Sequence, residues 1–253
     1  MFAMVRSRQE VPRNDACEAG EAPQDIAPAP SHSWQDDGCH AKSGVNREGK
    51  MTEHSMYHDG NRHLQDAFGS RQLADRLEQK LARAAFTDDD RAFIEGVSYF
   101  FLATANAEGQ PDCSFKGGAP GFVQITASDE LAFPDYDGNG MFKSLGNVVV
   151  NPNVGLLFIA MHGSPRRLRV NGTATVRSDD PLLGRTVGAQ LIVRVKARAI
   201  FPNCPRYIPE MTLTGPSAYT PVAGVETPEP KWKSFADFAD TVPPRRPTWN
   251  GTA

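Results

Sequence analysis

The stretch LAFPDYDGNGMFKSLGNVVVNPNVG, residues 131–155, decides the fold that we expect of this chain. It opens with three apolar residues that are typical of the end of a strand, and a polar turn follows them. Asn139 can cap a helix that begins near Gly140, because its side-chain oxygen can accept a hydrogen bond from the first turn. Asn151-Pro152 ends that helix, because a residue before proline is disfavoured in the helical region. The pattern predicts a strand, a turn and a helix in direct succession.

The expected helix carries a group of polar side chains close to its start. Its apolar face is formed by Met141, Phe142, Leu145, Val148 and Val149. Its other face carries Lys143, Ser144 and Asn147. An ordinary surface helix explains this pattern. A phosphate site explains it as well, since a helix start offers free N–H groups and the positive end of a dipole, here beside a lysine.

The strands that follow this helix favour the phosphate site. Residues 154–161 form an apolar run that is typical of a buried strand, and a second strand is expected from Arg166 to Gly172. One face of the second strand is basic and the other is apolar, because side chains alternate along a strand. The alternating residues are Arg167, Arg169 and Asn171 against Leu168 and Val170.

The rest of the chain has the pattern of helices followed by short strands. Residues 61–85 have a helical pattern that Gly69-Ser70 interrupts, and Thr87 can cap a further helix that ends near Gly96. Many short strands with few helices between them predict a mainly β protein of the α+β class, folded as a largely antiparallel barrel. Strands are expected at 98–105, 110–116, 122–126, 131–133, 154–161, 166–176 and 190–200, and short helices at 179–188 and 231–240.

The composition divides the chain into four regions. Residues 1–55 contain few large apolar side chains, so burial cannot offset the entropy of ordering them, and we expect them to be disordered. The alternative is a start at Met51 or Met56, in which case residues 1–50 are not translated in the native protein. The expected regions are the disordered tail at 1–55, helices at 56–97, a barrel domain at 98–209 and a proline-rich segment at 210–253.

Charge and apolar content exclude several classes of protein. The 253 residues carry a net charge of -3 with a sequence pI near 6.1, so we expect no nucleic acid and no anionic membrane as a partner. No run reaches the ~18 apolar residues that a membrane span requires. The first residues, MFAMVRSRQEV, lack the apolar region of a secretory signal. These observations predict a cytoplasmic protein.

The familiar metal and nucleotide motifs are missing from the sequence. The four cysteines lack C-x-x-C spacing, and His54 and His58 have no third ligand beside them, so we predict no metal site. The glycines of KGGAPG, residues 116–121, lack the order of a dinucleotide-binding loop. Phe142 stands where a P-loop requires a glycine before its lysine, which excludes a nucleoside triphosphatase of that type.

Four pieces of the chain, in their order and spacing, carry a resemblance to a known family. They are FLATANAEGQPDCSFKGGAPGF (101–122), the stretch 131–158, PRRLRVNGTATV (165–176) and IFPNCPRYI (200–208). They resemble the pyridoxamine 5′-phosphate oxidase-like FMN-binding split barrels, and in particular the predicted flavin-nucleotide-binding branch of that family. The resemblance implies an FMN-binding split β-barrel with flanking helices and a homodimer with FMN at the subunit interface. It also implies a flavin-dependent oxidoreductase of unknown small-molecule substrate.

The resemblance also assigns roles to particular residues. The family's lysine before the glycine turn is Lys116 here, and its basic pair at the helix start becomes Lys143-Ser144. Arg167 stands where the oxidases carry a glutamine that touches the flavin, although pairing with a carboxylate is an equal alternative. The predicted cofactor-binding residues are Ser114, Lys116, Lys143, Ser144, Asn147 and Arg167, and the predicted substrate-binding residues are Arg206 and Tyr207.

The chain departs from the true oxidases at two places. Pro111-Asp112 stands in the region where the family has an arginine that contacts FMN. The tail reads TVPPRRPT at 241–248, without the family's Arg-Leu-x-Pro element. We therefore expect no pyridoxamine 5′-phosphate oxidase activity. The alternatives are a non-catalytic protein that binds or senses flavin, or the same barrel with deazaflavin F420 or haem. Trp232 in the tail is a candidate cap for a flavin ring or a packing anchor.

Overall fold

A computed structural model describes residues 55–251, and the chain divides into two compact units, residues 1–68 and 69–253. The predicted disordered tail lies almost wholly outside the described residues. In the first unit, helix α1 (Asp59–Ala67) begins at a capping box. There His58 accepts a hydrogen bond from Gly60 N, and the Asn61 side chain accepts one from His58 N.

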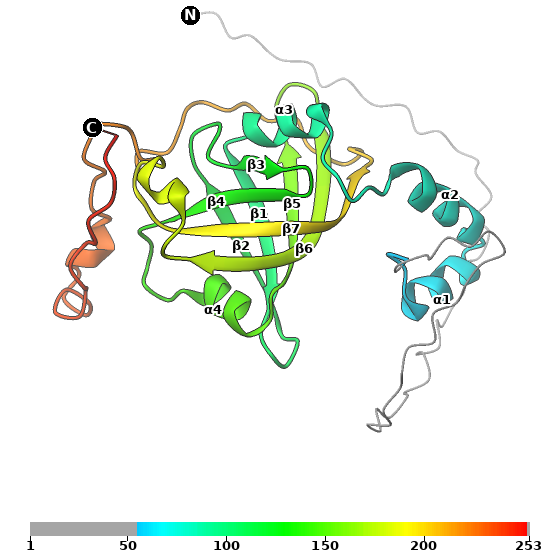
Figure 1. Ribbon diagram of the computed structural model, residues 1–253, viewed down its shortest axis with the longest axis horizontal. Coiled ribbons are helices and arrows are strands. Elements are labelled where there is room, and N and C mark those ends of the chain that lie inside the picture. The colour runs from blue at the N-terminus through cyan, green and yellow to red at the C-terminus, as the bar shows by residue number, and fades with distance from the viewer. Residues whose placement is uncertain (1–54, 252–253) are drawn as a thin grey trace, which may run out of the picture. The chain divides into compact units, whose positions relative to one another are not determined.

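The second unit begins with two helices that the sequence predicted (Figure 1). Helix α2 (Arg71–Leu81) follows Gly69, whose φ of +62° stops a continuous helix at the expected interruption. Helix α3 (Asp88–Gly96) is capped by Thr87, whose hydroxyl accepts from Asp90 N while the Asp90 carboxylate accepts from Thr87 N. This capping box confirms the predicted start of the helix.

Within the described residues, seven strands form one antiparallel sheet in the order β2-β1-β5-β6-β7-β4-β3. Figure 1 shows these strands wrapping around a common centre. The strands β2 and β3 end the order and are not paired with each other, so the sheet stays open along one line. The strands are β1 (Tyr99–Ala105), β2 (Pro111–Gly117), β3 (Gln124–Ala127), β4 (Glu130–Tyr136), β5 (Asn153–Ala160), β6 (Arg166–Arg177) and β7 (Ala189–Asn203).

A single hydrophobic core fills the space that the sheet encloses. Side chains from every strand except β2, and from α3 and α4 (Lys143–Val150), belong to one buried cluster among the described residues. Phe100 lies at its centre, with its ring centroid 4.9 Å from that of Phe133 and 5.1 Å from that of Phe158. A curled, incompletely closed antiparallel sheet around one core is a split barrel, which confirms the predicted α+β class and fold.

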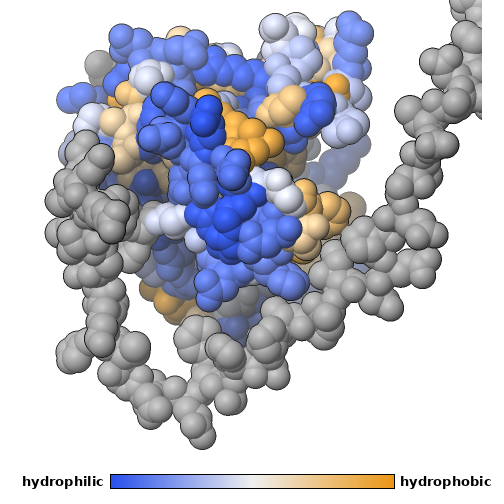
Figure 2. All heavy atoms as spheres, turned by 90° about the vertical axis from the view of Figure 1, so that its right-hand side faces the viewer, coloured by the Kyte–Doolittle hydropathy of each residue, from blue (hydrophilic) through white to orange (hydrophobic). Residues whose placement is uncertain are grey.

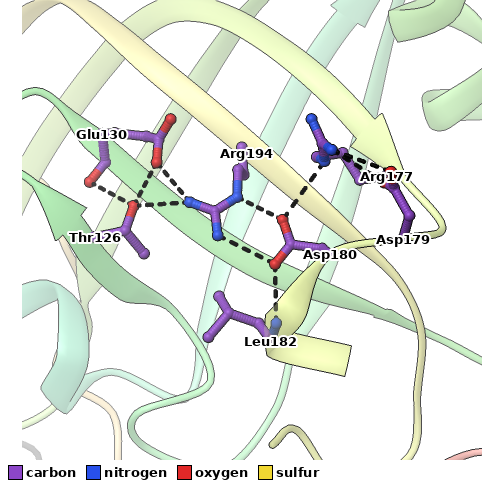
Figure 3. A network of polar contacts seen from close by, with 7 residues as sticks. All are labelled: Thr126, Glu130, Arg177, Asp179, Asp180, Leu182 and Arg194. Carbon is purple, nitrogen blue, oxygen red and sulfur yellow. Dashed lines mark hydrogen bonds and ion pairs between the residues drawn. The ribbon is translucent and has the colours of Figure 1, made fainter. Parts of the chain in front are cut away.

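A network of ion pairs joins β4 and β7 to the 3₁₀-helix η1 (Pro181–Gly184), as Figure 3 shows. The Asp180 side chain is buried, and its carboxylate accepts from Arg194 Nε at 2.5 Å and from Leu182 N at 2.9 Å. Arg194 also contacts Glu130 Oε1 at 2.6 Å. The guanidinium holds the pKa of the Asp180 carboxyl below its usual range, chiefly through the hydrogen bond between them.

Helix α4 differs from its prediction in where it begins. It starts at Lys143 and not near Gly140, while Asn151 ends it as expected. Gly140 and Phe142 have φ of +75° and +47°, and these left-handed conformations keep both residues out of the helix. The Asn139 side chain therefore caps nothing on α4 and instead accepts a hydrogen bond from Met141 N at 3.0 Å. The preceding strand also runs on to Tyr136, where a polar turn was expected.

The two faces of α4 are also partly reversed relative to the prediction. The predicted apolar face included Met141 and Val149, which are 71% and 75% exposed. The polar side chains of Ser144 and Asn147 are buried with Leu145, because hydrogen bonds to β1 and β2 compensate their removal from water. The start of α4 therefore directs polar groups into the protein.

The C-terminal segment is largely irregular. The helix predicted at 231–240 is wrong for most of that range, because only η2 (Lys231–Ser234), a short 3₁₀-helix, is regular. The segment is attached to the barrel by Lys233 Nζ, 2.6 Å from Asp137 Oδ2, and by Gly188 N, which donates to the Trp249 carbonyl at 3.0 Å.

The surface that is seen from one side of the molecule is mostly polar. Figure 2, which views the molecule from the right-hand side of Figure 1, shows hydrophilic residues with separate hydrophobic areas between them. Scattered apolar side chains are normal on a protein surface. Within residues 55–251, no helix combines the length and the apolar character needed to cross a bilayer.

Candidate functional site

A cavity of about 440 Å³ lies between β2, the end of β4 and the start of α4. This volume is within the range of ~300–1,000 Å³ that is usual for small-molecule sites. We call it the first cavity. It is lined by residues 112–117, 134–136 and 138–145 and by Gln190 of β7.

Strand β2 contributes one alternating set of polar side chains to the first cavity. Asp112, Ser114 and Lys116 are half-buried, whereas Cys113 and Phe115 are exposed. The sequence predicted this alternation. It follows from the period of two along a strand, which sends successive side chains to opposite faces of the sheet.

The start of α4 contributes uncapped backbone donors to the same cavity. Phe142 adopts a left-handed conformation, and no side chain caps the helix. The first N–H groups of any helix have no partner within it, so those of Lys143 and Ser144 are donors at the positive end of the helix dipole. Both residues line the first cavity. A left-handed residue followed by a helix start forms a concave set of amides that suits an anion.

The charges in the first cavity are only partly compensated. Within residues 55–251, neither Lys116 nor Lys143 forms a salt bridge. Asp112 is the nearby acid on β2, and its Oδ2 lies 3.1 Å from Ser144 Oγ. Ser144 Oγ also lies 2.9 Å from Ser114 Oγ, so the two hydroxyls and the carboxylate form one hydrogen-bonded chain.

A second polar group lies where β4 pairs with β7. Gln190 Nε2 donates to Asp135 Oδ2 at 2.8 Å and to the Tyr136 carbonyl at 3.1 Å. Burial raises the pKa of the Asp135 carboxyl, although Gln190 and Lys116 oppose that shift. Burial also raises the pKa of Tyr136 to about 12, so its phenol is protonated at neutral pH.

The structure brings four of the predicted cofactor residues together and leaves the other predicted residues elsewhere. Ser114, Lys116, Lys143 and Ser144 line the first cavity. Asn147 lies one turn further along α4, where its Nδ2 donates to Thr104 Oγ1 at 3.0 Å. Arg167 on β6 donates to the Cys204 carbonyl and forms no salt bridge with a described residue. Arg206 and Tyr207 are exposed after β7 and do not line the first cavity.

Sequence reasoning missed several residues of the first cavity, including Asp112, Asp135, Tyr136 and Gln190. Asp112 shares the face of Ser114 and Lys116, and this alternation was a signal that could have included it. Asp135, Tyr136 and Gln190 meet only through the pairing of β4 with β7, which no local pattern reveals. In the described part of the chain, no three histidine, cysteine or acidic side chains gather in a way that could bind a metal ion.

Fold and cavity together define a split-barrel protein with an anion-suited site at a helix start. The family model described as pyridoxamine 5′-phosphate oxidase matches residues 86–213, about half of the chain, and the chain belongs to this family. The match begins at the loop before α3 and ends shortly after β7. No curated protein matches the chain.

Solved structures that match part of the chain have low sequence identity. A pyridoxamine 5′-phosphate oxidase-like protein from Lactobacillus delbrueckii is 19% identical, with 47% of this chain and 95% of that chain covered and a TM-score of 0.37. An FMN-binding protein from Syntrophomonas wolfei is 12% identical, with coverages of 56% and 97% and a TM-score of 0.37. HutZ, the haem storage protein of Vibrio cholerae, is 16% identical, with coverages of 46% and 89% and a TM-score of 0.32. Similarity at this level does not assign a ligand to this chain.

Proposed function

We propose that the first cavity binds FMN and that the protein is a flavin-dependent oxidoreductase acting on a small molecule. One observation carries the proposal: the uncapped start of α4 and two lysines without salt bridges line the same cavity. A phosphate is the group that such donors suit best. Membership of the family supports FMN as the phosphate compound.

The donor chemistry of the first cavity fits a phosphorylated cofactor. Lys143 and the amides at the start of α4 would bind the phosphate, and Lys116 and Ser114 would bind polar groups of the same molecule from β2. Asp112 opposes an anion, but its carboxylate already accepts a hydrogen bond from Ser144 Oγ at 3.1 Å. When bound, FMN would supply the redox chemistry, while these residues would orient it.

The proposal is tested by comparing flavins that differ only in the phosphate. Flavin-free protein is titrated with FMN and with riboflavin, and binding is followed by flavin fluorescence. We expect FMN to bind at least about tenfold more tightly, because a hydrogen bond to a charged group contributes ~1.5–3 kcal/mol. Equal affinity for the two flavins would remove the phosphate site from the proposal. Turnover with an added reductant then distinguishes an enzyme from a protein that only binds or senses flavin.

FMN-loaded protein is expected not to oxidise pyridoxamine 5′-phosphate above background. The reason is that the tail lacks the Arg-Leu-x-Pro element of the true oxidases, and Asp112 occupies a region where they carry an arginine. A substrate phosphate requires charged donors in fixed geometry, and Arg206, the replacement that the sequence suggested, does not line the first cavity. Oxygen consumption is the measurement. Robust turnover that disappears in Arg206→Ala would overturn this expectation.

The proposal includes a homodimer. Phe115 on the edge strand β2 is 61% exposed, and its ring lies 5.5 Å from that of Tyr99 and 6.0 Å from that of Phe101. Aromatic side chains gathered on one exposed sheet face favour a protein partner, and a second copy would place that partner beside the first cavity.

Sedimentation should therefore give the mass of two chains, and Phe115→Asp should shift the protein towards one chain, because it places a charge in the proposed interface. Phe235→Asp is the control, since Phe235 is also exposed but lies in the C-terminal segment. A wild-type protein that sediments as one chain with FMN fully bound would contradict the dimer.

A further inference from the structure

A second cavity, of about 280 Å³, shares a wall with the first. The shared residues belong to the loop between β4 and α4 and to β7, so the two cavities are adjacent. The residues that line both cavities are Gly138, Asn139, Gly140, Phe142 and Gln190. The remaining wall comes from Asp137 and from eight residues of the C-terminal segment, which lie beyond the part of the chain that matches the family. These eight are Trp232, Lys233, Phe238, Thr241, Val242, Pro243, Pro244 and Arg246.

Ion pairs attach the C-terminal wall to the barrel. Lys233 Nζ lies 2.6 Å from Asp137 Oδ2 and 3.2 Å from Glu229 Oε2, and its side chain is only 11% exposed. These two carboxylates raise the pKa of Lys233, with Asp137 as the larger cause. Arg245 Nε also lies 3.9 Å from Asp137 Oδ2, and within the C-terminal segment Arg245 donates to the Thr227 carbonyl at 2.7 Å. These contacts give the C-terminal segment a defined position against the barrel.

The second cavity combines flat apolar surfaces with one uncompensated cation. The rings of Trp232 and Phe238 meet edge to face, with centroids 6.2 Å apart and planes at 78°. Lys233 is neutralised by its two carboxylate partners, whereas Arg246 forms no salt bridge with any residue between 55 and 251. Aromatic faces bind planar apolar groups, and a free guanidinium binds a carboxylate or phosphate with two parallel hydrogen bonds.

We infer that the second cavity binds a small aromatic anion, with its ring against Trp232 and Phe238 and its carboxylate or phosphate on Arg246. The inference rests on the proposed function in one respect: it takes this anion to be the substrate that reacts beside FMN in the first cavity. The volume is near the lower end of the ~300–1,000 Å³ that is usual for ligand sites, which limits the ligand to one or two fused rings.

Calorimetry with defined probes tests the inference. The FMN-loaded protein is titrated with 1-naphthoate, with 1-naphthyl phosphate and with neutral 1-naphthamide. We expect at least one of the two anions to bind about tenfold or more tightly than the amide, because only an anion pairs with the guanidinium. Arg246→Gln should lower the affinity for that anion about tenfold and abolish the preference, and Arg246→Lys should restore part of it. Trp232→Leu should weaken all three probes.

The matched control is Arg198→Gln, which removes an exposed arginine on β7 that lines neither cavity and should leave probe binding unchanged. Equal affinity for anions and amide, or unchanged binding in folded Arg246→Gln, would overturn the inference. Titration of flavin-free protein separates the two proposals. Binding that depends on Arg246 in a protein that never binds FMN would support the second cavity and refute the proposed function. FMN binding without probe binding would refute the second cavity alone.

Discussion

Lys143→Ala is expected to weaken FMN binding by about 1.5–3 kcal/mol, which corresponds to an increase in Kd of roughly 10- to 150-fold. Lys143 is the first residue of α4, lines the first cavity and has no salt bridge with a described residue. Its ammonium and the uncapped amides beside it are the donors that the proposal assigns to the phosphate. Fluorescence titration of flavin-free protein with FMN measures the effect.

Two further variants make the Lys143 result interpretable. Lys143→Arg keeps the charge and should retain most of the affinity. Lys80→Ala removes an exposed lysine of α2 that lines none of the described cavities, and it should leave the Kd unchanged. Riboflavin should bind to wild type and to Lys143→Ala with similar affinity, because it has no phosphate. Unchanged FMN affinity in folded Lys143→Ala would remove this residue from the site.

Asp180→Ala is expected to lower the free energy of unfolding by about 1.5–3 kcal/mol, the scale of a hydrogen bond to a charged group. Asp180 is buried, and the change leaves the Arg194 guanidinium without its closest partner in the network of Figure 3. Urea unfolding measures the effect. The control is Asp179→Ala, because Asp179 pairs with Arg177 at the surface, where such pairs contribute at most about 1 kcal/mol. Equal losses in the two variants would contradict the role of burial.

The same carboxylate gives wild type a defined pH dependence. The folded state holds the pKa of Asp180 below its ordinary value, and Asp90 is shifted in the same direction. A carboxyl with a lowered folded pKa stabilises the protein fully above its unfolded pKa of about 3.9, and that contribution is lost as the pH falls through the folded pKa. Wild type should therefore lose stability below about pH 4. Asp180→Ala should lose less over the same interval.

Local signals predicted most of the fold. The cap at Thr87, the interruption at Gly69 and the alternation along β2 each depend on a few neighbouring residues, and the structure has all three. The sequence of short strands predicted the barrel because every strand except β2 contributes its apolar side chains to one core. These features are local, so a single sequence contains the information that they require.

The start of α4 was predicted less well, for a physical reason. The apolar spacing counted Met141 and Phe142 as helical, but Phe142 is left-handed, a conformation that a bulky residue rarely adopts. The burial of Ser144 depends on partners from β2 that lie 30 and 32 positions away in the chain. Gln190 joins the first cavity only through strand pairing. Long-range contacts of this kind leave no periodic signal in the sequence.

The ligand that co-purifies with the full chain tests the central claim most directly. Its absorption spectrum is recorded on the native protein, and its mass is measured after release by denaturation. We predict the spectrum of an oxidised flavin and the mass of FMN, in an amount close to one per chain. The spectrum of haem or of a deazaflavin, or the mass of a flavin without a phosphate, would contradict the account.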